Sequence, residues 1–108
     1  MKTIYIAGKV TGVSVAERTA KFKAAETMLQ KRGWLTINPL KLVKNPNQDW
    51  QTAMDICLAN LRTADAIYML PCSVYSAGAQ LELQTAIELN KDIYYELENV
   101  EDGAANNI

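Results

Sequence analysis

Tyr75-Ser-Ala-Gly-Ala-Gln-Leu-Glu-Leu-Gln-Thr-Ala-Ile-Glu-Leu-Asn90 has the pattern of a loop that leads into a helix. Ser76 occupies the place of an N-cap, where its hydroxyl accepts a hydrogen bond from a free backbone N–H of the first turn. Gly78 has no side chain, so a second molecule can approach the backbone closely. The free N–H groups and the positive end of the helix dipole favour an anion at this helix start.

The same helix carries a carboxylate on the side where apolar residues gather. At 100° per residue, five apolar residues form the inward face: Ala79, Leu83, Ala86, Ile87 and Leu89. Glu82 falls inside this arc, whereas Glu88 falls on the opposite side. Carboxylates are seldom buried without a partner. Glu82 is therefore either a functional group or a carboxylate that bonds a neighbouring backbone, and periodicity leaves both interpretations open.

Short β-rich runs alternate with helical patterns along the chain. The predicted strands are residues 3–8, 34–38, 66–70 and 92–96, and the predicted helices are residues 14–32, 50–63 and 76–90. This alternation favours a parallel sheet with helices on both faces. We therefore predict an α/β three-layer sandwich of the Rossmann-like or flavodoxin-like type, with four to five strands in the order 2-1-3-4. Residues 1–97 form this domain, and residues 98–108 form a flexible tail.

The predicted topology places a ligand site at one edge of the sheet. In sheets of this kind ligands bind outside the carboxyl ends of the strands, beside the point where the strand order reverses. Four features meet there: Gly8 and Lys9 after the first strand, Asn38 after the second, the loop after the third, and the helix start at Ser76. Motif and topology therefore indicate the same crevice.

Composition excludes several classes of function. The chain has 108 residues, of which 49% are apolar, and this favours one domain with a hydrophobic core. Its net charge of −1 argues against nucleic acid or a membrane as partner. It has no histidine, and its two cysteines lack metal-type spacing, so we expect no metal. No signal peptide, P-loop or GxGxxG motif is found, which favours a cytoplasmic protein without a cofactor.

Several motifs resemble those of one superfamily, over about residues 2–96. They are Lys2-Thr-Ile-Tyr-Ile-Ala-Gly8, Asn38-Pro39, Asp55 in Met-Asp-Ile-Cys-Leu, Asp65-Ala-Ile-Tyr-Met-Leu-Pro71 and Ser76-Ala-Gly-Ala-Gln-Leu-Glu82-Leu. The chain resembles the nucleoside 2-deoxyribosyltransferase superfamily, especially its short members and the related deoxynucleoside 5′-monophosphate N-glycosidases. The last motif is the most specific, because both its spacing and its surroundings match.

The resemblance implies roles for individual residues. Glu82 matches the nucleophile, and Tyr5 matches a first-strand tyrosine near it. Asp55 matches an aspartate that contacts the base or assists its protonation, although helical periodicity alone assigns Asp55 to the solvent. Ser76 stands where nucleoside-using members have an acid and monophosphate-using members have serine. Lys9 stands where the monophosphate glycosidases have a phosphate-binding serine, and a lysine supplies the same contact by charge or is merely solvated.

The resemblance thus implies an enzyme that cleaves or exchanges the N-glycosidic bond of a 2′-deoxynucleotide or deoxynucleoside. The reaction would pass through a covalent glycosyl-enzyme on Glu82, without a cofactor, in a homodimer or larger homo-oligomer. The alternatives are a non-catalytic nucleotide-binding module of the same fold, an NAD-cleaving domain of the Toll/interleukin-receptor-like type, and a purely structural protein. The base, the 5′-phosphate and the choice between hydrolysis and transfer stay open.

Overall fold

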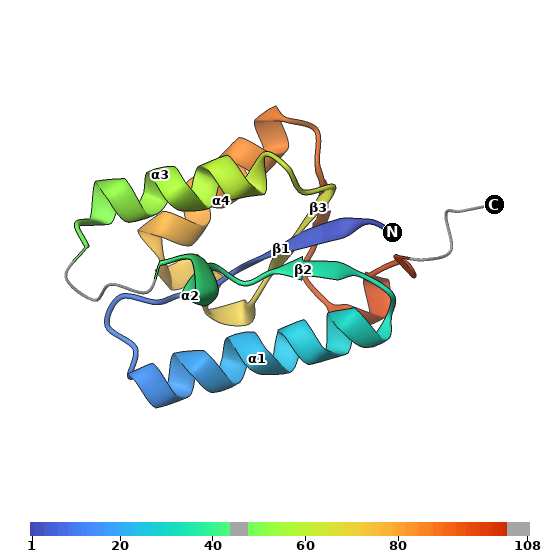
Figure 1. The fold of residues 1–108 in the computed structure, drawn as a ribbon, viewed down its shortest axis with the longest axis horizontal. Helices are drawn as coiled ribbons and strands as arrows, with labels where there is room; N and C mark the ends of the chain where they lie inside the picture. The colour runs from blue at the N-terminus through green and yellow to red at the C-terminus, as the bar shows by residue number, and fades with distance from the viewer. Residues whose placement is uncertain (44–47, 104–108) are drawn as a thin grey trace.

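A four-stranded parallel sheet forms the centre of the molecule (Figure 1). The computed structural model describes residues 1–43 and 48–103. The strands are β1 (Thr3–Ala7), β2 (Leu35–Ile37), β3 (Ala66–Met69) and β4 (Asp92–Tyr94). Their order is β2-β1-β3-β4, and each neighbouring pair is parallel. The predicted α/β fold and strand order are confirmed.

Three long helices begin where a polar side chain caps them. They are α1 (Val15–Lys31), α3 (Trp50–Leu61) and α4 (Ala77–Glu88). Ser14 accepts from the Glu17 N–H at 3.2 Å, and Ser76 accepts from the Ala79 N–H at 3.1 Å, as the N-cap patterns predict. Three short elements were not predicted: helix α2 (Pro39–Leu42) and the 3₁₀ helices η1 (Pro71–Tyr75) and η2 (Leu97–Asn99). Two of these begin with proline, whose fixed φ suits the first helical position.

The helices cover opposite faces of the sheet. Helix α1 lies along one face, and α3 and α4 lie along the other (Figure 1). The side chains of β1 alternate between the two layers: Ile4 and Ile6 pack with Phe22 of α1, whereas Tyr5 and Ala7 belong to the cluster under α3 and α4. Tyr5 therefore enters the layer that also contains Glu82.

The buried face of α4 differs from the predicted one. Its buried residues are Ala79, Glu82 and Ala86, whereas Ile87 and Leu89 are 52% and 43% exposed. The buried arc is thus centred nearer to Glu82, which leaves Ile87 outside it, and Leu89 is already the C-cap. The inclusion of Ile87 and Leu89 in the inward face was wrong, and Glu82 lies deeper in the packed face than periodicity indicated.

Gly8 directly follows β1, at a position where a side chain would not fit. A Cβ there would lie 2.7 Å from Leu70 Cδ1 and 3.0 Å from Phe22 Cζ, both in the core. We expect Gly8→Ala to lower the free energy of unfolding by about 1–3 kcal/mol, because overpacking forces core side chains to shift. Urea denaturation measures this loss. A change smaller than about 0.5 kcal/mol, the usual range for a surface substitution, would contradict the packing argument.

The chain after β4 returns to the end of α1. The Arg32 guanidinium donates to the carbonyls of Leu97 and Val100, and Trp34 Nε1 donates to the Glu101 carbonyl at 2.7 Å. Of the tail expected to be flexible, residues 98–103 are therefore bonded to the domain, while residues 104–108 lie outside the described residues. Within the described ranges, no helix combines the length and the apolar character needed to cross a membrane.

Candidate active site

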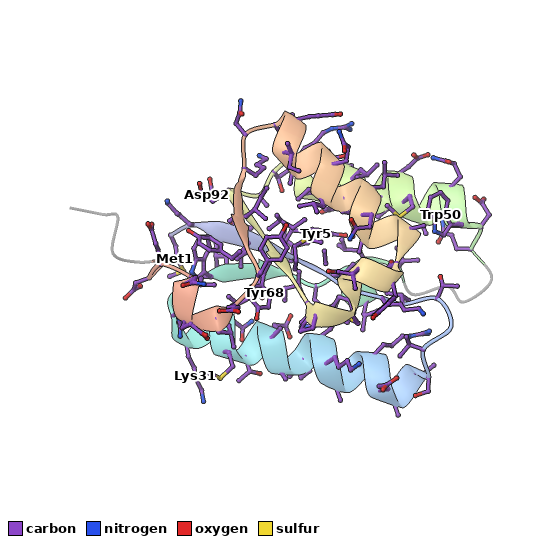
Figure 2. The ribbon with its side chains drawn as sticks, turned by 180° about the vertical axis from the view of Figure 1, so that it is seen from behind. Met1, Tyr5, Lys31, Trp50, Tyr68 and Asp92 are labelled. Carbon is purple, nitrogen blue, oxygen red and sulfur yellow. The ribbon has the colours of Figure 1, made fainter. Side chains whose placement is uncertain are left out.

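A cavity of about 680 Å³ lies at the carboxyl ends of β1 and β3, where the topology predicts the ligand site. Its walls come from the β1–α1 loop and from helices α1, α2, α3 and α4. An apolar part is formed by five side chains: Pro39, Leu40, Val43, Trp50 and Met54. Figure 2 shows Tyr5 in the interior and Trp50 at the outer end of α3. The cavity is thus large enough for a nucleotide-sized ligand and mostly apolar, as small-molecule sites generally are.

Glu82 is the carboxylate of this cavity, and it is only 5% exposed. Helix α4 carries it inward, and the Tyr5 hydroxyl from β1 donates a hydrogen bond to its Oε2 atom. Burial raises the pKa of Glu82 from 4.5 to about 7, while the bond from Tyr5 opposes that rise. Near neutral pH the side chain is therefore present both as an acid and as a carboxylate.

Tyr5 is a permanent donor to this carboxylate. It is fully buried, and burial, followed by the nearby Glu82 charge, raises the pKa of its phenol far above the usual value. The hydroxyl therefore stays protonated at any pH at which the protein works. The predicted neighbourhood of Tyr5 and Glu82 is what the structure shows.

Cys57 is a third buried side chain in this region, besides Tyr5 and Glu82, and the sequence did not lead us to predict it as a site residue. It belongs to α3, lines the cavity, is 7% exposed and lies in the same buried cluster as Tyr5. Burial raises the pKa of its thiol. The available signal was its place on the apolar face of α3, next to Met54, which also lines the cavity.

Two cations line the cavity. Lys9 follows β1, as expected, and Arg18 comes from the first turn of α1, which the sequence reasoning did not single out. The Arg18 guanidinium donates to the carbonyls of Val10 and Val13 at 3.4 and 3.3 Å, so it also braces the loop that carries Lys9. Among the described lining residues, the charged ones are therefore two cations and Glu82, which makes the cavity suited to an anion.

Ser76 and Gly78 line the cavity at the start of α4. The Ser76 hydroxyl is engaged as the helix cap. A Cβ on Gly78 would lie 3.1 Å from Met54 Sδ and 3.8 Å from Trp50 Nε1. The side of Gly78 that lacks a side chain therefore faces α3, and the glycine lets the two helices approach. The expected approach of a ligand to its backbone stays a prediction, and Gly78 does line the cavity.

Asp55 and Asn38 do not line the cavity. Asp55 is exposed on α3 and accepts from Gln51 Nε2 at 3.0 Å. Asn38 is buried, and its Oδ1 atom accepts from the Leu40 N–H at 3.0 Å as the N-cap of α2. The exposed position of Asp55 is the one that helical periodicity predicted. Asn38 instead caps α2 beside the cavity.

Asp55→Asn provides a test of that placement. We expect this substitution to change the reaction proposed below by no more than about twofold, as is usual for an exposed side chain without a special contact. Initial rates measured side by side with the unsubstituted protein check this. A loss of about tenfold or more would instead support the role that the resemblance implies.

Metal ligands are not grouped in this site. In residues 1–43 and 48–103, no set of three or more His, Cys, Asp or Glu side chains is placed to hold a metal ion. Both cysteines are free thiols. The chemistry available from the described side chains is that of a carboxylate, a phenol, a thiol and two cations.

The fold matches that of nucleoside 2-deoxyribosyltransferase-like structures. The chain belongs to the family described as "Domain of unknown function (DUF4406)", whose model matches residues 2–95 and which is a family of that superfamily, so the resemblance is confirmed. No curated protein sequence matches the chain.

Two solved structures share the fold. A 2-deoxyribosyltransferase from Leishmania mexicana is 21% identical, with a TM-score of 0.66 over 86% of this chain and 62% of its own. The CMP N-glycosidase BcmB from Clostridium botulinum is 14% identical, with a TM-score of 0.58 over 85% of this chain and 66% of its own. The chain thus spans less than two-thirds of the length of either protein.

Proposed function

We propose that the chain is an enzyme that breaks the N-glycosidic bond of a deoxynucleotide or deoxynucleoside, by hydrolysis or by transfer to a second base. The observation that carries this proposal is Glu82, a buried carboxylate of the switch-point cavity that Tyr5 holds by a hydrogen bond. The two structural neighbours, a CMP N-glycosidase and a 2-deoxyribosyltransferase, support the same class of reaction.

The proposed chemistry has two steps. A carboxylate oxygen of Glu82 attacks the anomeric carbon, and the carbon–nitrogen bond breaks with its electron pair leaving on the base. The leaving base takes a proton from solvent water, and the sugar remains as an ester on Glu82. Water then attacks the anomeric carbon, which releases the sugar and regenerates the carboxylate, or a second base attacks and gives transfer. Tyr5 bonds Oε2 and thereby fixes the carboxyl plane while the other oxygen reacts.

The cations of the cavity support a substrate with a 5′-phosphate. Lys9 and Arg18 lie on the same cavity as Glu82, and the start of α4 adds the positive end of a helix dipole. A nucleoside has no group that requires these charges, whereas a monophosphate carries about two negative charges. The monophosphate is therefore our preferred substrate class.

Lys9→Met tests this preference, because methionine keeps the apolar stem and removes the charge. We expect the KM for a deoxynucleoside monophosphate to rise about tenfold or more, as for the loss of a charge-assisted hydrogen bond, with the KM for the nucleoside unchanged. Lys31→Met is the matched control, because Lys31 lies at the far end of α1 (Figure 2). Equal changes in KM for both substrates would show that Lys9 does not bind the phosphate.

The direct test is release of free base. The protein is incubated with a panel of deoxynucleosides, their monophosphates, CMP and NAD, and the products are separated by chromatography. Base from deoxynucleosides or deoxynucleotides supports the proposal, and a second added base distinguishes transfer from hydrolysis. Base from NAD alone would favour the NAD-cleaving alternative, and base from no member of the panel would contradict enzymatic turnover of these substrates.

A non-catalytic nucleotide-binding module is the second candidate, and the position of Asp55 favours it. Glu82 is the sole carboxylate among the described lining residues, so the second acid that the resemblance implies is missing from the cavity. Calorimetry with deoxynucleoside monophosphates distinguishes the two candidates. Binding without release of base would establish the module.

A further inference from the structure

Glu26 is a second buried carboxylate, on α1, to which the mechanism proposed above gives no role. It is only 2% exposed, and removing a carboxylate from water costs free energy unless the group is paired. Lys41 of α2 supplies the pairing, because its Nζ atom lies 3.0 Å from Oε1 and 3.0 Å from Oε2 of Glu26. Lys23 adds a longer contact, 3.5 Å from Oε1. The pair of Glu26 and Lys41 therefore joins α1 to α2.

Helix α2 is a wall of the cavity, and its position depends on its neighbours. Pro39 and Leu40 of α2, together with Val43 directly after it, belong to the apolar part of the cavity. Figure 1 shows α2 between α1 and α3. The helix spans only four residues, and a helix of this length is not stable without tertiary contacts. The contacts of α2 with other elements therefore decide where this wall lies.

The apolar contacts of α2 are divided between two layers. Leu40 packs against the cluster that contains Phe22 of α1, whereas Leu42 and Val43 pack against the cluster under α3 and α4. Hydrophobic contacts have no preferred direction, whereas a hydrogen-bonded ion pair fixes distance and orientation. Apolar replacement of a buried ion pair is often neutral or stabilising, so stability alone does not account for the pair. A defined position of α2 accounts for it.

We propose that Glu26 is a positioning residue, which through Lys41 fixes α2 and with it the apolar wall that receives the base. The assignment rests on the proposed function. In that function Lys9 and Arg18 suit the phosphate, and the apolar wall suits the flat rings of a base. The inference deepens the function by naming the contact that keeps the base side of the cavity ready for substrate.

The expected consequence is a change in affinity and not in the chemical step. A wall that is in place for only part of the time lowers the apparent affinity by that fraction. Bound substrate then holds α2 in place, so the cost falls on KM. The reacting carboxylate Glu82 lies on α4 and its donor Tyr5 on β1, so other elements carry the groups that set kcat.

Glu26→Gln is the main test, because it removes the buried charge and leaves Lys41, whose side chain is 61% exposed, to water. We expect KM to rise about fivefold for a deoxynucleoside and for its monophosphate alike, with kcat unchanged. Lys41→Met should have the same effect, and the double variant should not exceed it, because one contact is lost in each case. Lys41→Arg keeps the charge and two hydrogen bonds to the carboxylate, and should keep KM within about twofold.

Lys23→Met is the matched control. Lys23 contacts the same carboxylate, and its side chain is 65% exposed, but it lies three positions away on the same helix. Its loss removes a charge beside Glu26 without detaching α2, so KM should not change. Equal effects of Lys23→Met and Lys41→Met would show that charge balance matters and the position of α2 does not. An unchanged KM in Glu26→Gln, or a fall in kcat as large as the rise in KM, would also overturn the proposal.

Amide hydrogen exchange measures the order of α2 without substrate. The Val43 N–H donates to the Pro39 carbonyl at 3.1 Å at the end of this helix. We expect the Val43 amide to exchange about fivefold faster in Glu26→Gln, and at the unsubstituted rate in Lys23→Met. Unchanged exchange in Glu26→Gln would contradict the role of the ion pair, and this variant decides the question even if Lys41→Met does not fold.

The two readouts separate this inference from the proposed function. The protein could release no base while Glu26→Gln weakens monophosphate binding, measured by calorimetry, and speeds the exchange of Val43. The ion pair then positions the wall of a binding site, and the enzymatic proposal fails alone. If base is released and Glu26→Gln changes neither KM nor the exchange of Val43, the inference about Glu26 fails alone.

Discussion

Replacing Glu82 with glutamine is expected to reduce release of base at least about 10⁴-fold, the scale seen when a nucleophile is removed. The amide nitrogen and oxygen of glutamine are too weakly nucleophilic to attack the anomeric carbon. Glutamine has nearly the same size, and its carbonyl oxygen still accepts a hydrogen bond from Tyr5, so the cavity keeps its shape. Single-turnover assays with chromatography of the free base measure the loss.

Glu88→Gln is the control for this variant. Glu88 lies on the same helix, on the exposed side, where its carboxylate accepts from Gln84 Nε2 at 3.2 Å. We expect its rate to equal that of the unsubstituted protein. If Glu82→Gln retained activity within about tenfold, the covalent mechanism would be wrong. Mass spectrometry of the unsubstituted protein during turnover, in search of the sugar ester, tests the same step independently.

The second large effect is on stability, and it depends on pH. The pKa of Glu82 in the folded protein is about 7, against a usual value of 4.5, so the folded state binds this proton more tightly than the unfolded state. The stability that this proton provides is complete below about pH 4.5 and is lost as the pH rises through 7. The expected loss is about 3 kcal/mol, from 1.36 kcal/mol per unit of pKa.

Glu82→Gln should remove this loss, because glutamine does not titrate. We therefore expect the variant to match the unsubstituted protein near pH 4.5 and to exceed its free energy of unfolding by about 3 kcal/mol at pH 8. Urea denaturation at several pH values measures the difference, in which the contributions of all other titrating groups cancel. Glu88→Gln should show no such pH-dependent gain, and parallel curves for Glu82→Gln and the unsubstituted protein would show that burial does not shift the Glu82 titration.

Local patterns were sufficient to predict the architecture. The caps at Ser14 and Ser76 and the alternation of β-rich runs with helical patterns depend on residues within a few positions of each other, and these interactions form in much the same way in any fold. The strand order then followed from general rules for parallel sheets. The short helix α2 and the two 3₁₀ helices were missed, because each is shorter than the span over which a periodic pattern can be recognised.

The candidate site was predicted in part. Periodicity placed Glu82 on the packed face of its helix, and the switch-point rule placed Lys9 and Ser76 beside it. Asp55 came from the resemblance, and the structure shows that Cys57, two positions further along α3, lines the cavity whereas Asp55 does not. Two positions along a helix change the direction of a side chain by about 200°. Which of them faces Glu82 therefore depends on how α3 packs against the sheet and α4.

The sequence alone thus determined the α/β class, the strand order, the edge of the sheet that holds the cavity and the unusual position of Glu82. These features follow from short-range periodicity and from the chirality of chain connections. Only the tertiary structure decided that Cys57 lines the cavity, that Arg18 joins Lys9 and that Gly78 serves the contact between α3 and α4. Each of these is a contact between elements distant in the sequence, and it is set by helix rotation and packing, which no local pattern encodes.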